Sequence, residues 1–331
     1  MHDKNDKILV TGGTGYTGSH LVRRLVNDGY DVRTFVRNPD KFPLLKDINV
    51  EIATGDLRNK DDVNKAMDGV NVVYHIAALF RAENVSREDM FDINAGGAEN
   101  MLQAAEKQGV KRFVHCSTIG VHGDVKNPPA DEESPYNPGD YYQESKLEGE
   151  LIAQRFMKAG NIPISIYRPA GIYGPEEKRF LKLIKSIRNR TFVMIGSGEI
   201  LYHMVYIDDL VDGIILCGTQ DEAVGEIFIL AGDDNLTLND LVHLIADIQN
   251  VPAPKLRVPF APVYAAGYAA EVLFKPFGVQ PPIYRRRVDF FRKTRSFDIS
   301  KAKDVLGYKP KVSLREGLQN TIAWYETEGL F

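Results

Sequence analysis

Cysteine is scarce in this chain, and its charges are nearly balanced. The 331 residues include only Cys116 and Cys217, which lack metal-ligand spacing. This scarcity argues against a disulfide scaffold and a metal centre, and it predicts a protein of the reducing cytoplasm. The net charge is only -4, which gives no reason to expect a nucleic-acid partner.

Long hydrophobic runs are also missing. No uninterrupted apolar run reaches the roughly 18–20 residues of a membrane-spanning helix, and the polar residues 1–7 lack the apolar core of a signal peptide. The longest candidate, 258–274, is interrupted by Pro259, Pro262 and Glu271. We predict no integral membrane segment and interpret 258–274 as an apolar helix of a smaller lobe, with a peripheral membrane contact left open.

Glycine, by contrast, is concentrated near the N-terminus. The sequence Thr-Gly-Gly-Thr-Gly-Tyr-Thr-Gly at 11–18 follows the apolar run 8–10 and precedes a helix-like run. Strand, glycine-rich turn and helix in this order are typical of a dinucleotide-binding loop, where glycines allow a tight turn and close approach to a pyrophosphate. The helix N-terminus also attracts phosphate. The glycines fit two registers, one starting at Gly12 and one at Gly13, and both continue through Gly15 and Gly18.

The first half of the chain alternates strand-like and helix-like segments. We predict strands at 8–10, 31–36, 50–53, 70–76, 113–116 and 164–167, and helices at 18–28, 61–67, 94–108 and 141–159. This alternation predicts an α/β fold with a doubly wound parallel sheet of the Rossmann type. We expect residues 1–170 to form an NAD(P)-binding domain to which 205–232 return, with a helix at 205–217 and a strand at 226–230. Residues 171–204 and 233–331 would form a smaller α/β substrate-binding lobe.

Tyr142 and Lys146 lie four residues apart in the predicted helix 141–159. This spacing places both side chains on one helix face. A nearby ammonium lowers the ordinary tyrosine pKa of about 10, so Tyr142 can exchange a proton with a substrate oxygen. Ser117 and Thr118 directly follow the strand 113–116, which puts a hydroxyl at the ligand edge of the sheet. Each pattern alone is also typical of surface pairs and turns.

Together, these features resemble the extended short-chain dehydrogenase/reductase family, of the NAD-dependent epimerase/dehydratase type. The resemblance covers nearly the whole chain. The segments that carry it are 11–18, 55–57, 73–78, 94–100, 117–123, 167–175, 297–302, 306–310 and 314–318. Aligning 117–123 on its last residue, Gly123, selects Thr118 rather than Ser117 as the catalytic hydroxyl.

The resemblance implies a role for each matching residue. Tyr142 would be the general acid/base, Lys146 would lower its pKa and hold the nicotinamide ribose, and Thr118 would orient the substrate oxygen. The other residues implied at the cofactor are Gly12, Gly15, Tyr16, Thr17, Gly18, Asp56, Leu57, Ala77, Ala78, Asn94, Arg168 and Pro169. The resemblance also implies a homodimer built on the helices at 94–108 and 141–159.

The end of the second predicted strand bears on the choice of cofactor. NAD-binding folds of this kind usually place Asp or Glu there to bind the adenosine ribose, but this chain has Val36 and Arg37. Arg37, with Lys41, can clamp a 2′-phosphate instead. This favours NADP(H), while stacking of Arg37 on the adenine would leave NAD(H) open.

Departures from the family's motifs bear on the reaction. Thr118 is followed by Ile119 and Gly120, where the family's dehydratases and decarboxylases carry an acidic residue, so we disfavour both reactions. The loop 196–204 has apolar and aromatic residues where nucleotide-sugar epimerases carry polar contacts. We therefore expect hydride transfer to or from a secondary alcohol or ketone of a hydrophobic or sterol-like small molecule. The hydroxysteroid dehydrogenase and dihydroflavonol reductase branch is the most similar in character.

Two other functions stay open. A nucleotide-sugar 4-epimerase with a tightly held cofactor would use the same hydride step, and the basic residues at 285–295 would suit its diphosphate. The same cluster would also suit a solvated or subunit-contacting face, or anionic lipid. A non-catalytic, cofactor-sensing protein would not need Thr118, Tyr142 and Lys146 together, which argues against that function. His203 is a further candidate for a polar contact to substrate.

Overall fold

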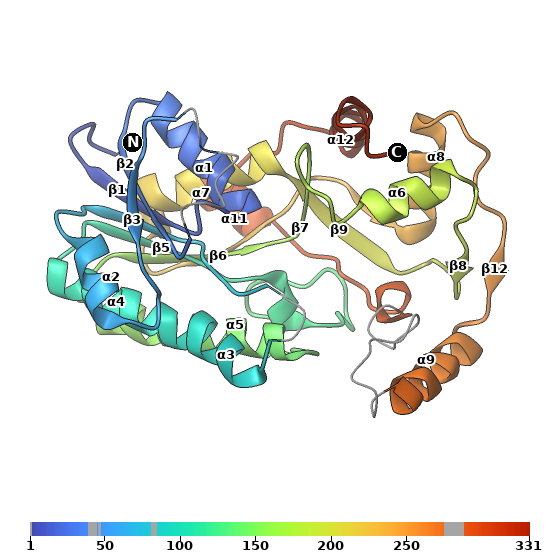
Figure 1. Ribbon diagram of the computed structural model, residues 1–331, viewed down its shortest axis with the longest axis horizontal. Coiled ribbons are helices and arrows are strands. Elements are labelled where there is room, and N and C mark those ends of the chain that lie inside the picture. The colour runs from blue at the N-terminus through green and yellow to red at the C-terminus, as the bar shows by residue number, and fades with distance from the viewer. Residues whose placement is uncertain (1, 39–44, 46–47, 81–84, 275–287) are drawn as a thin grey trace.

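The structure is a computed structural model that describes residues 2–38, 45, 48–80, 85–274 and 288–331. A seven-stranded parallel sheet with helices on both faces forms the larger part, and small sheets and helices lie beyond one of its ends (Figure 1). From edge to edge, the strands are β10 (Ile227–Leu230), β6 (Ile164–Pro169), β5 (Arg112–Cys116), β4 (Val72–His75), β1 (Lys7–Thr11), β2 (Asp31–Val36) and β3 (Glu51–Thr54). This confirms the predicted Rossmann-type α/β fold.

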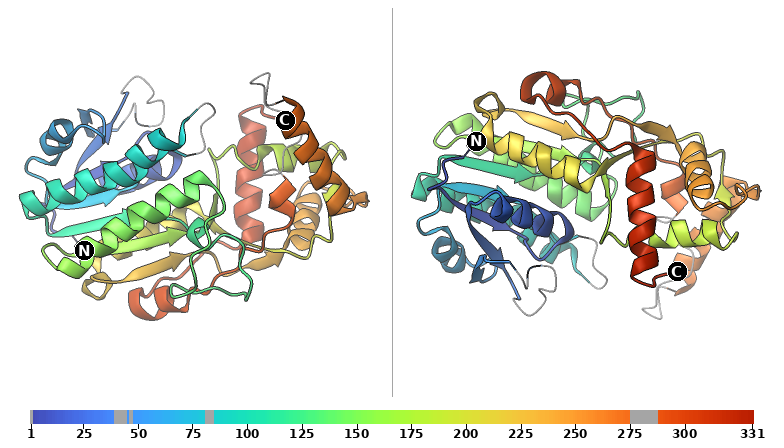
Figure 2. Two further views of the ribbon diagram at one scale, coloured as in Figure 1. Left: turned by 90° about the horizontal axis from the view of Figure 1, so that it is seen from below. Right: turned by 90° about the horizontal axis from the view of Figure 1, so that it is seen from above.

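Two hydrophobic cores lie against the two faces of this sheet. Ile8 and Val10 of β1 belong to one core and Leu9 to the other, as expected when successive side chains of a strand point to opposite faces. The helices of the first face are α1 (Tyr16–Asn27), α7 (Ile207–Thr219) and α11 (Ser300–Leu306) (Figures 1 and 2). Those of the second face are α2 (Lys60–Met67), α3 (Arg87–Phe91), α4 (Gly97–Gln108) and α5 (Tyr141–Ala159). Because helices cover both faces, the central strands are buried along nearly their whole length.

The ends of helix α5 are set by local sequence. The carboxylate of Asp140 accepts a hydrogen bond from the backbone N–H of Gln143 and so caps the helix start. Gly160 ends the helix in a left-handed conformation with φ of 73°. This cap begins α5 at Tyr141, directly before the predicted catalytic residue.

The remaining elements lie beyond the carboxyl ends of the large sheet's strands (Figure 1). They include a three-stranded sheet of β11 (Asn235–Thr237), β9 (Leu201–Tyr206) and β7 (Gly171–Tyr173), and a two-stranded sheet of β12 (Arg257–Val258) and β8 (Met194–Ile195). Their helices are α6 (Leu181–Arg188), α8 (Leu238–Ile248), α9 (Phe260–Phe274) and α12 (Leu314–Thr327). Short 3₁₀ helices cover Ile119–His122, Asp221–Ala223 and Asp289–Phe291. In the ranges that the structure describes, no helix combines the length and the apolar character needed to cross a bilayer.

The strands and helices predicted in the first half of the chain start and end within two residues of the observed ones, with one exception. The helix predicted at 94–108 begins instead as a π-helical turn, Asp92–Gly96, and becomes α-helical at Gly97. Helix α5 comes so close to this turn that a Cβ atom on Gly149 would lie 2.6 Å from the Asn94 carbonyl oxygen. The segment 205–217, which we expected to be helical throughout, starts with the last two residues of β9. Tertiary contacts of this kind leave no signal in the local pattern.

Candidate active site

A pocket of about 630 Å³ opens at the carboxyl edge of the large sheet. It is lined by the glycine-rich loop after β1, by residues that follow β2 to β6, and by side chains of the smaller lobe. The ligands of open parallel α/β sheets bind at this edge. The volume is in the ordinary range for a small-molecule or cofactor site.

The structure decides between the two registers of the glycine-rich loop. Gly12, Gly15 and Gly18 line the pocket, whereas Gly13 packs against Thr34 of β2. A Cβ atom on Gly18 would lie 2.1 Å from the Gly12 carbonyl oxygen, so only glycine allows α1 to approach the loop this closely. No side chain caps α1, and the free N–H groups of its first turn are therefore available to an anion.

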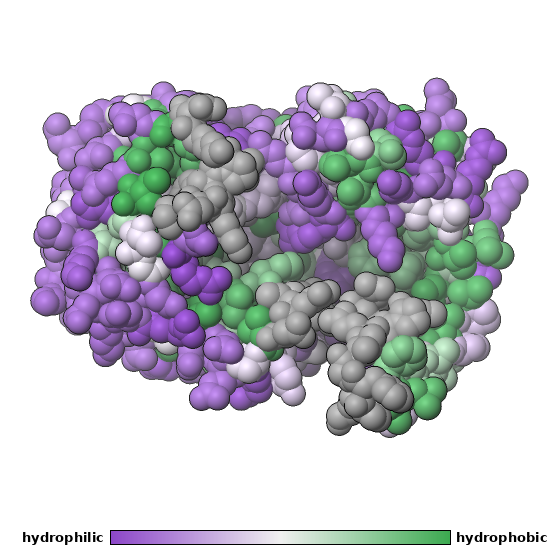
Figure 3. Space-filling model, viewed as in Figure 1, coloured by the Kyte–Doolittle hydropathy of each residue, from purple (hydrophilic) through white to green (hydrophobic). Residues whose placement is uncertain are grey.

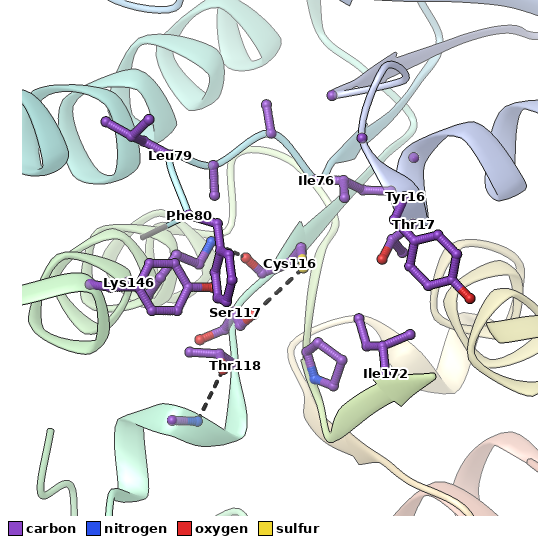
Figure 4. A pocket seen from close by; sticks show the side chains of 18 of the residues that line it. Tyr16, Thr17, Ile76, Leu79, Phe80, Cys116, Ser117, Thr118, Lys146 and Ile172 are labelled. Atoms are coloured by element: carbon purple, nitrogen blue, oxygen red, sulfur yellow. Dashed lines mark hydrogen bonds between the residues drawn. The ribbon is translucent and has the colours of Figure 1, made fainter. Parts of the chain in front are cut away.

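The pocket fits a dinucleotide in two further respects. Asp56, Leu57, Ala77, Ala78 and Pro169 all line it, each just after or at the end of a strand. Tyr16 and Thr17, in the first turn of α1, line the same space (Figure 4). The glycine cradle and the uncapped first turn of α1 are the features that suit a bound diphosphate.

Arg37 lines the pocket directly after β2 and is exposed. Asp56, at the end of the neighbouring strand β3, is already paired: Arg58 Nη2 donates to Asp56 Oδ2 over 2.7 Å. The hydrogen bond from Arg58 lowers the pKa of Asp56, with Arg37 adding a smaller Coulombic contribution. Lys41, the other candidate for a 2′-phosphate contact, lies outside the described residues.

The two hydroxyls after β5 have different environments. The Thr118 hydroxyl oxygen accepts a hydrogen bond from the Gly120 backbone N–H over 3.0 Å, which leaves its own O–H free to donate into the pocket (Figure 4). The Ser117 hydroxyl is buried and donates to a carboxylate oxygen of Glu150. Thr118 is therefore the hydroxyl available to a substrate oxygen.

Tyr142 and Lys146 both line the pocket from α5. The Lys146 ammonium is buried and donates to the Cys116 carbonyl oxygen, and burial lowers the pKa of this lysine. The ring of Tyr142 meets the ring of Phe80 edge to face, with centroids 4.9 Å apart. Figure 4 shows Lys146, Thr118 and Phe80 around the same cavity.

Two of the residues implied at the cofactor, Asn94 and Arg168, are absent from the pocket lining. Asn94 lies on the π-helical turn, where its side chain bonds both the N–H and the carbonyl of Leu79 and donates to the Ser145 hydroxyl. It fixes the loop that carries Phe80 against α5. Asn94 therefore does not line the pocket itself but positions Leu79, which does.

Arg168 is fully buried below the pocket floor in an ion pair with Glu150 of α5. Its Nη2 donates to Glu150 Oε1 over 2.6 Å, and its Nε donates to Oε2 over 3.1 Å. Burial opposes ionisation of Glu150, but the hydrogen bonds and charge of Arg168 outweigh it and lower the pKa of the carboxyl. The second oxygen of Glu150 also accepts from Ser117, so this pair ties β6, α5 and the Ser117–Thr118 loop together.

The wall opposite the glycine-rich loop contains Phe80, Glu177 and Arg179, which we did not predict from the sequence. It also contains Tyr202 of the loop 196–204 and Arg295 of the basic cluster. Arg179 Nε donates to Glu177 Oε2 over 2.7 Å, and its guanidinium lies 5.4 Å from the Phe80 ring centroid. The Arg295 guanidinium lies 5.5 Å from the Tyr202 centroid and forms no ion pair within the described residues. Four segments distant in sequence supply this wall. The sequence indicated only the aromatic character of the loop that carries Tyr202 and the basic character around Arg295.

His203 borders the pocket, but backbone groups already occupy both of its ring nitrogens. Nε2 lies 2.7 Å from the Gly232 carbonyl oxygen and Nδ1 accepts from the Phe297 N–H, which fixes the neutral tautomer with its proton on Nε2. Burial also lowers the pKa of this histidine. A polar contact from His203 to substrate, which we considered from the sequence, is therefore not supported.

Comparison with known proteins agrees with this geometry. Residues 8–231 match the NAD dependent epimerase/dehydratase family. The chain is 29% identical to 3β-hydroxysteroid-dehydrogenase/decarboxylase isoform 1 of Arabidopsis thaliana, over 95% of this chain and 78% of the relative. It is 27% identical to the N-acetyl-α-D-glucosaminyl-diphospho-ditrans,octacis-undecaprenol 4-epimerase of Escherichia coli O157:H7, over 97% and 95%. The crystal structure of UDP-glucuronic acid 4-epimerase from Bacillus cereus in complex with NAD superposes with a TM-score of 0.78 at 25% identity, covering 97% of this chain and 99% of that one.

Proposed function

Because the chain belongs to the NAD-dependent epimerase/dehydratase family, we propose that it is an oxidoreductase acting on a secondary alcohol or ketone of a hydrophobic small molecule. The observation that carries this proposal is that Thr118, Tyr142 and Lys146 line the same pocket as the glycine-rich loop. Apolar and aromatic side chains, among them Phe80, Ile172 and Tyr202, border the space in front of them. The Arabidopsis relative, named as a hydroxysteroid dehydrogenase, supports this substrate class.

The proposed chemistry follows from these positions. A bound nicotinamide would supply or accept the hydride. In the oxidation direction, the Tyr142 phenolate takes the proton of the substrate hydroxyl, while the Thr118 O–H donates a hydrogen bond to the substrate oxygen. The Lys146 ammonium, held by the Cys116 carbonyl, favours the phenolate form of Tyr142. The reverse steps reduce a ketone.

A pair of neighbouring tyrosines provides a matched test. We expect Tyr142→Phe to lower turnover of secondary alcohols by roughly 1000-fold, within the usual range for loss of a general acid/base. Tyr141→Phe should leave turnover unchanged, because Tyr141 is 57% exposed and does not line the pocket. The assay follows the absorbance of the reduced nicotinamide with a panel of 3-hydroxysteroids and smaller apolar alcohols. Equal turnover by the two variants would refute the mechanism.

One observation favours a second candidate, a 4-epimerase acting on a diphosphate-linked sugar. Arg295 faces the pocket without a carboxylate partner among the described residues, and a diphosphate could provide one. The named epimerase from E. coli acts on a diphosphate-linked sugar. This candidate predicts conversion of the sugar without net formation of reduced nicotinamide.

The choice of cofactor and the assembly are further proposals. Arg37, at the pocket edge, supports a preference for NADP(H), and its exchange for alanine should remove that preference.

We also propose that the chain divides into two domains, a nucleotide-binding domain of residues 1–170 with 205–232 and a substrate-binding lobe of residues 171–204 with 233–331. A homodimer through α4 and α5 in the cytoplasm completes the proposal. Light scattering of the purified chain tests the oligomeric state.

A further inference from the structure

Helix α9 presents an apolar face to solvent, where helices of globular proteins present charge. Residues 261, 262, 265, 266, 268, 269, 272 and 273 are exposed and fall on one face, and none of them is charged. Leu273 is 67% exposed and Val272 is 55% exposed. The only charged residue of the helix, Glu271, is half-buried on the opposite side.

Large exposed apolar side chains are concentrated at this helix. Eleven such side chains occur among the described residues, and four of them fall within the last seven positions of α9, between Tyr268 and Phe274. Figure 3 shows hydrophobic residues gathered where α9 lies, beside the grey atoms. In Figure 1 the helix stands away from the large sheet and its flanking helices. Such a concentration marks an interaction surface rather than scattered exposure.

The described residues around α9 carry a net positive charge. Residues 251–274 and 288–295 contain two acidic residues and five basic ones, a formal charge of +3, although the whole chain carries -4. The basic residues are Lys255, Arg257, Arg292, Lys293 and Arg295. The Arg292 guanidinium lies 5.7 Å from the Phe260 ring centroid and 5.5 Å from that of Tyr264, at the beginning of the apolar helix. Asp289 pairs with Arg292 over 2.7 Å and lies 3.5 Å from Lys293, so two cations share one carboxylate and a net positive charge remains there.

We propose that α9 and its flanking basic residues dock the protein on the surface of a bilayer that contains anionic lipids. At 1.5 Å per residue the 15-residue helix is about 22 Å long, shorter than the roughly 30 Å of a bilayer core, so it would lie in the plane of the interface. Its apolar face would contact the acyl boundary, and the basic residues would contact lipid phosphates. Repulsion between two faces of the same net positive charge disfavours a contact between two copies of this face.

This surface adjoins the proposed substrate wall. Arg292, which contacts α9, is three residues from Arg295 of the pocket, and the Phe290 ring lies 5.3 Å from that of Tyr202. A docked chain would therefore bring this side of the pocket close to the bilayer, where an amphiphilic substrate would reside. The docking proposal does not rest on the proposed oxidoreductase function, because it concerns only the surface.

Flotation of the purified full chain with vesicles tests the proposal. We expect binding to phosphatidylcholine vesicles that contain phosphatidylglycerol, weaker binding to phosphatidylcholine alone, and weakening by salt. The double variant Val272→Asp/Leu273→Asp should lower binding by about tenfold or more, because acidic groups cannot enter the acyl boundary. Arg292→Ala should lower it by about fivefold, the usual contribution of one basic residue near an anionic surface.

A control variant separates docking from net charge. Val224→Asp/Val305→Asp adds the same two charges at exposed valines outside α9, and it should retain nearly full binding. Nucleotide titration of each variant verifies that the pocket is intact, and this readout is independent of vesicle binding. Absence of wild-type binding to both vesicle types, or equal loss in the two double variants, would overturn the proposal. So would sedimentation velocity showing that α9 instead joins two copies of the chain.

Discussion

The two walls of the pocket are built in different ways. The cofactor wall consists of loops after successive strands β1 to β4, and much of its surface is backbone and small side chains, such as Gly12, Gly18 and Ala77. The substrate wall consists of large side chains, among them Phe80, Arg179 and Arg295, that come from segments more than 200 residues apart. A backbone-lined wall can be recognised in a short motif, whereas a side-chain wall exists only after the chain has folded.

The comparison extends to charge. On the substrate wall, Glu177 neutralises Arg179, but no carboxylate among the described residues neutralises Arg295. On the cofactor wall, the positive charge is the partial charge of the helix dipole at the α1 N-terminus, where the backbone N–H groups are free. We therefore expect single substitutions on the substrate wall to leave the sheet undisturbed, whereas substitutions at the close-packed glycines of the cofactor wall would displace α1.

The largest expected effect comes from the buried ion pair between Glu150 and Arg168, which lies below both walls. Glu150→Gln would leave Arg168 buried without its carboxylate, and we expect a loss of about 3–5 kcal/mol in the free energy of unfolding. The pKa of Glu150 is lower in the folded state than the unfolded value of about 4.3, so this contribution is present above that pH and is lost as the pH falls through the folded pKa.

Urea unfolding of the variant and wild type at neutral and acidic pH measures this effect. Glu148→Gln, on the same helix and without an ion pair among the described residues, is the control and should change stability little. A Glu150→Gln protein as stable as wild type at neutral pH would show that the buried pair supports neither wall.

The second-largest expected effect comes from a substitution in the cofactor wall. Gly18→Ala would place a Cβ atom 2.1 Å from the Gly12 carbonyl and push α1 away from the loop. We expect turnover to fall by roughly 100-fold, the cost of a misplacement of about 1 Å near the chemistry, together with weaker nucleotide binding by fluorescence titration. Gly96→Ala should be tolerated, because an added Cβ there meets nothing within 4 Å and φ is -61°. Comparable losses in both variants would contradict the packing argument.

The smallest expected effect comes from a substitution in the substrate wall. Arg179→Ala removes the partner of Glu177 and the cation beside Phe80, and we expect KM for the substrate to change by roughly tenfold, a usual cost for one lost contact in a specificity pocket. The Kd for the nucleotide should stay constant. Arg188→Ala, on α6 and paired with Glu326 away from the pocket, is the control. A parallel loss of nucleotide affinity would mean that the two walls are not independent.

These differences explain what could be predicted from the sequence. The parallel sheet followed from apolar runs alternating with helices, and the glycine-rich loop followed from residue type and context, because both depend on local backbone geometry. The pairing of Glu150 with Arg168 and the position of Arg295 depend on contacts between distant segments, which no local pattern encodes. The roles of Thr118, Tyr142 and Lys146 remain predictions, although all three lie in one pocket.

The most direct test of the proposed function is the identity of the nucleotide that the protein retains. Mass spectrometry of material released by denaturing the purified chain should find no stoichiometric nucleotide, because an oxidoreductase exchanges its cofactor in every cycle. Titration of the emptied protein should then show tighter binding of NADPH than of NADH, with the difference abolished by Arg37→Ala. Release of one NAD per chain would contradict this account and indicate the epimerase, which must keep and recycle its cofactor.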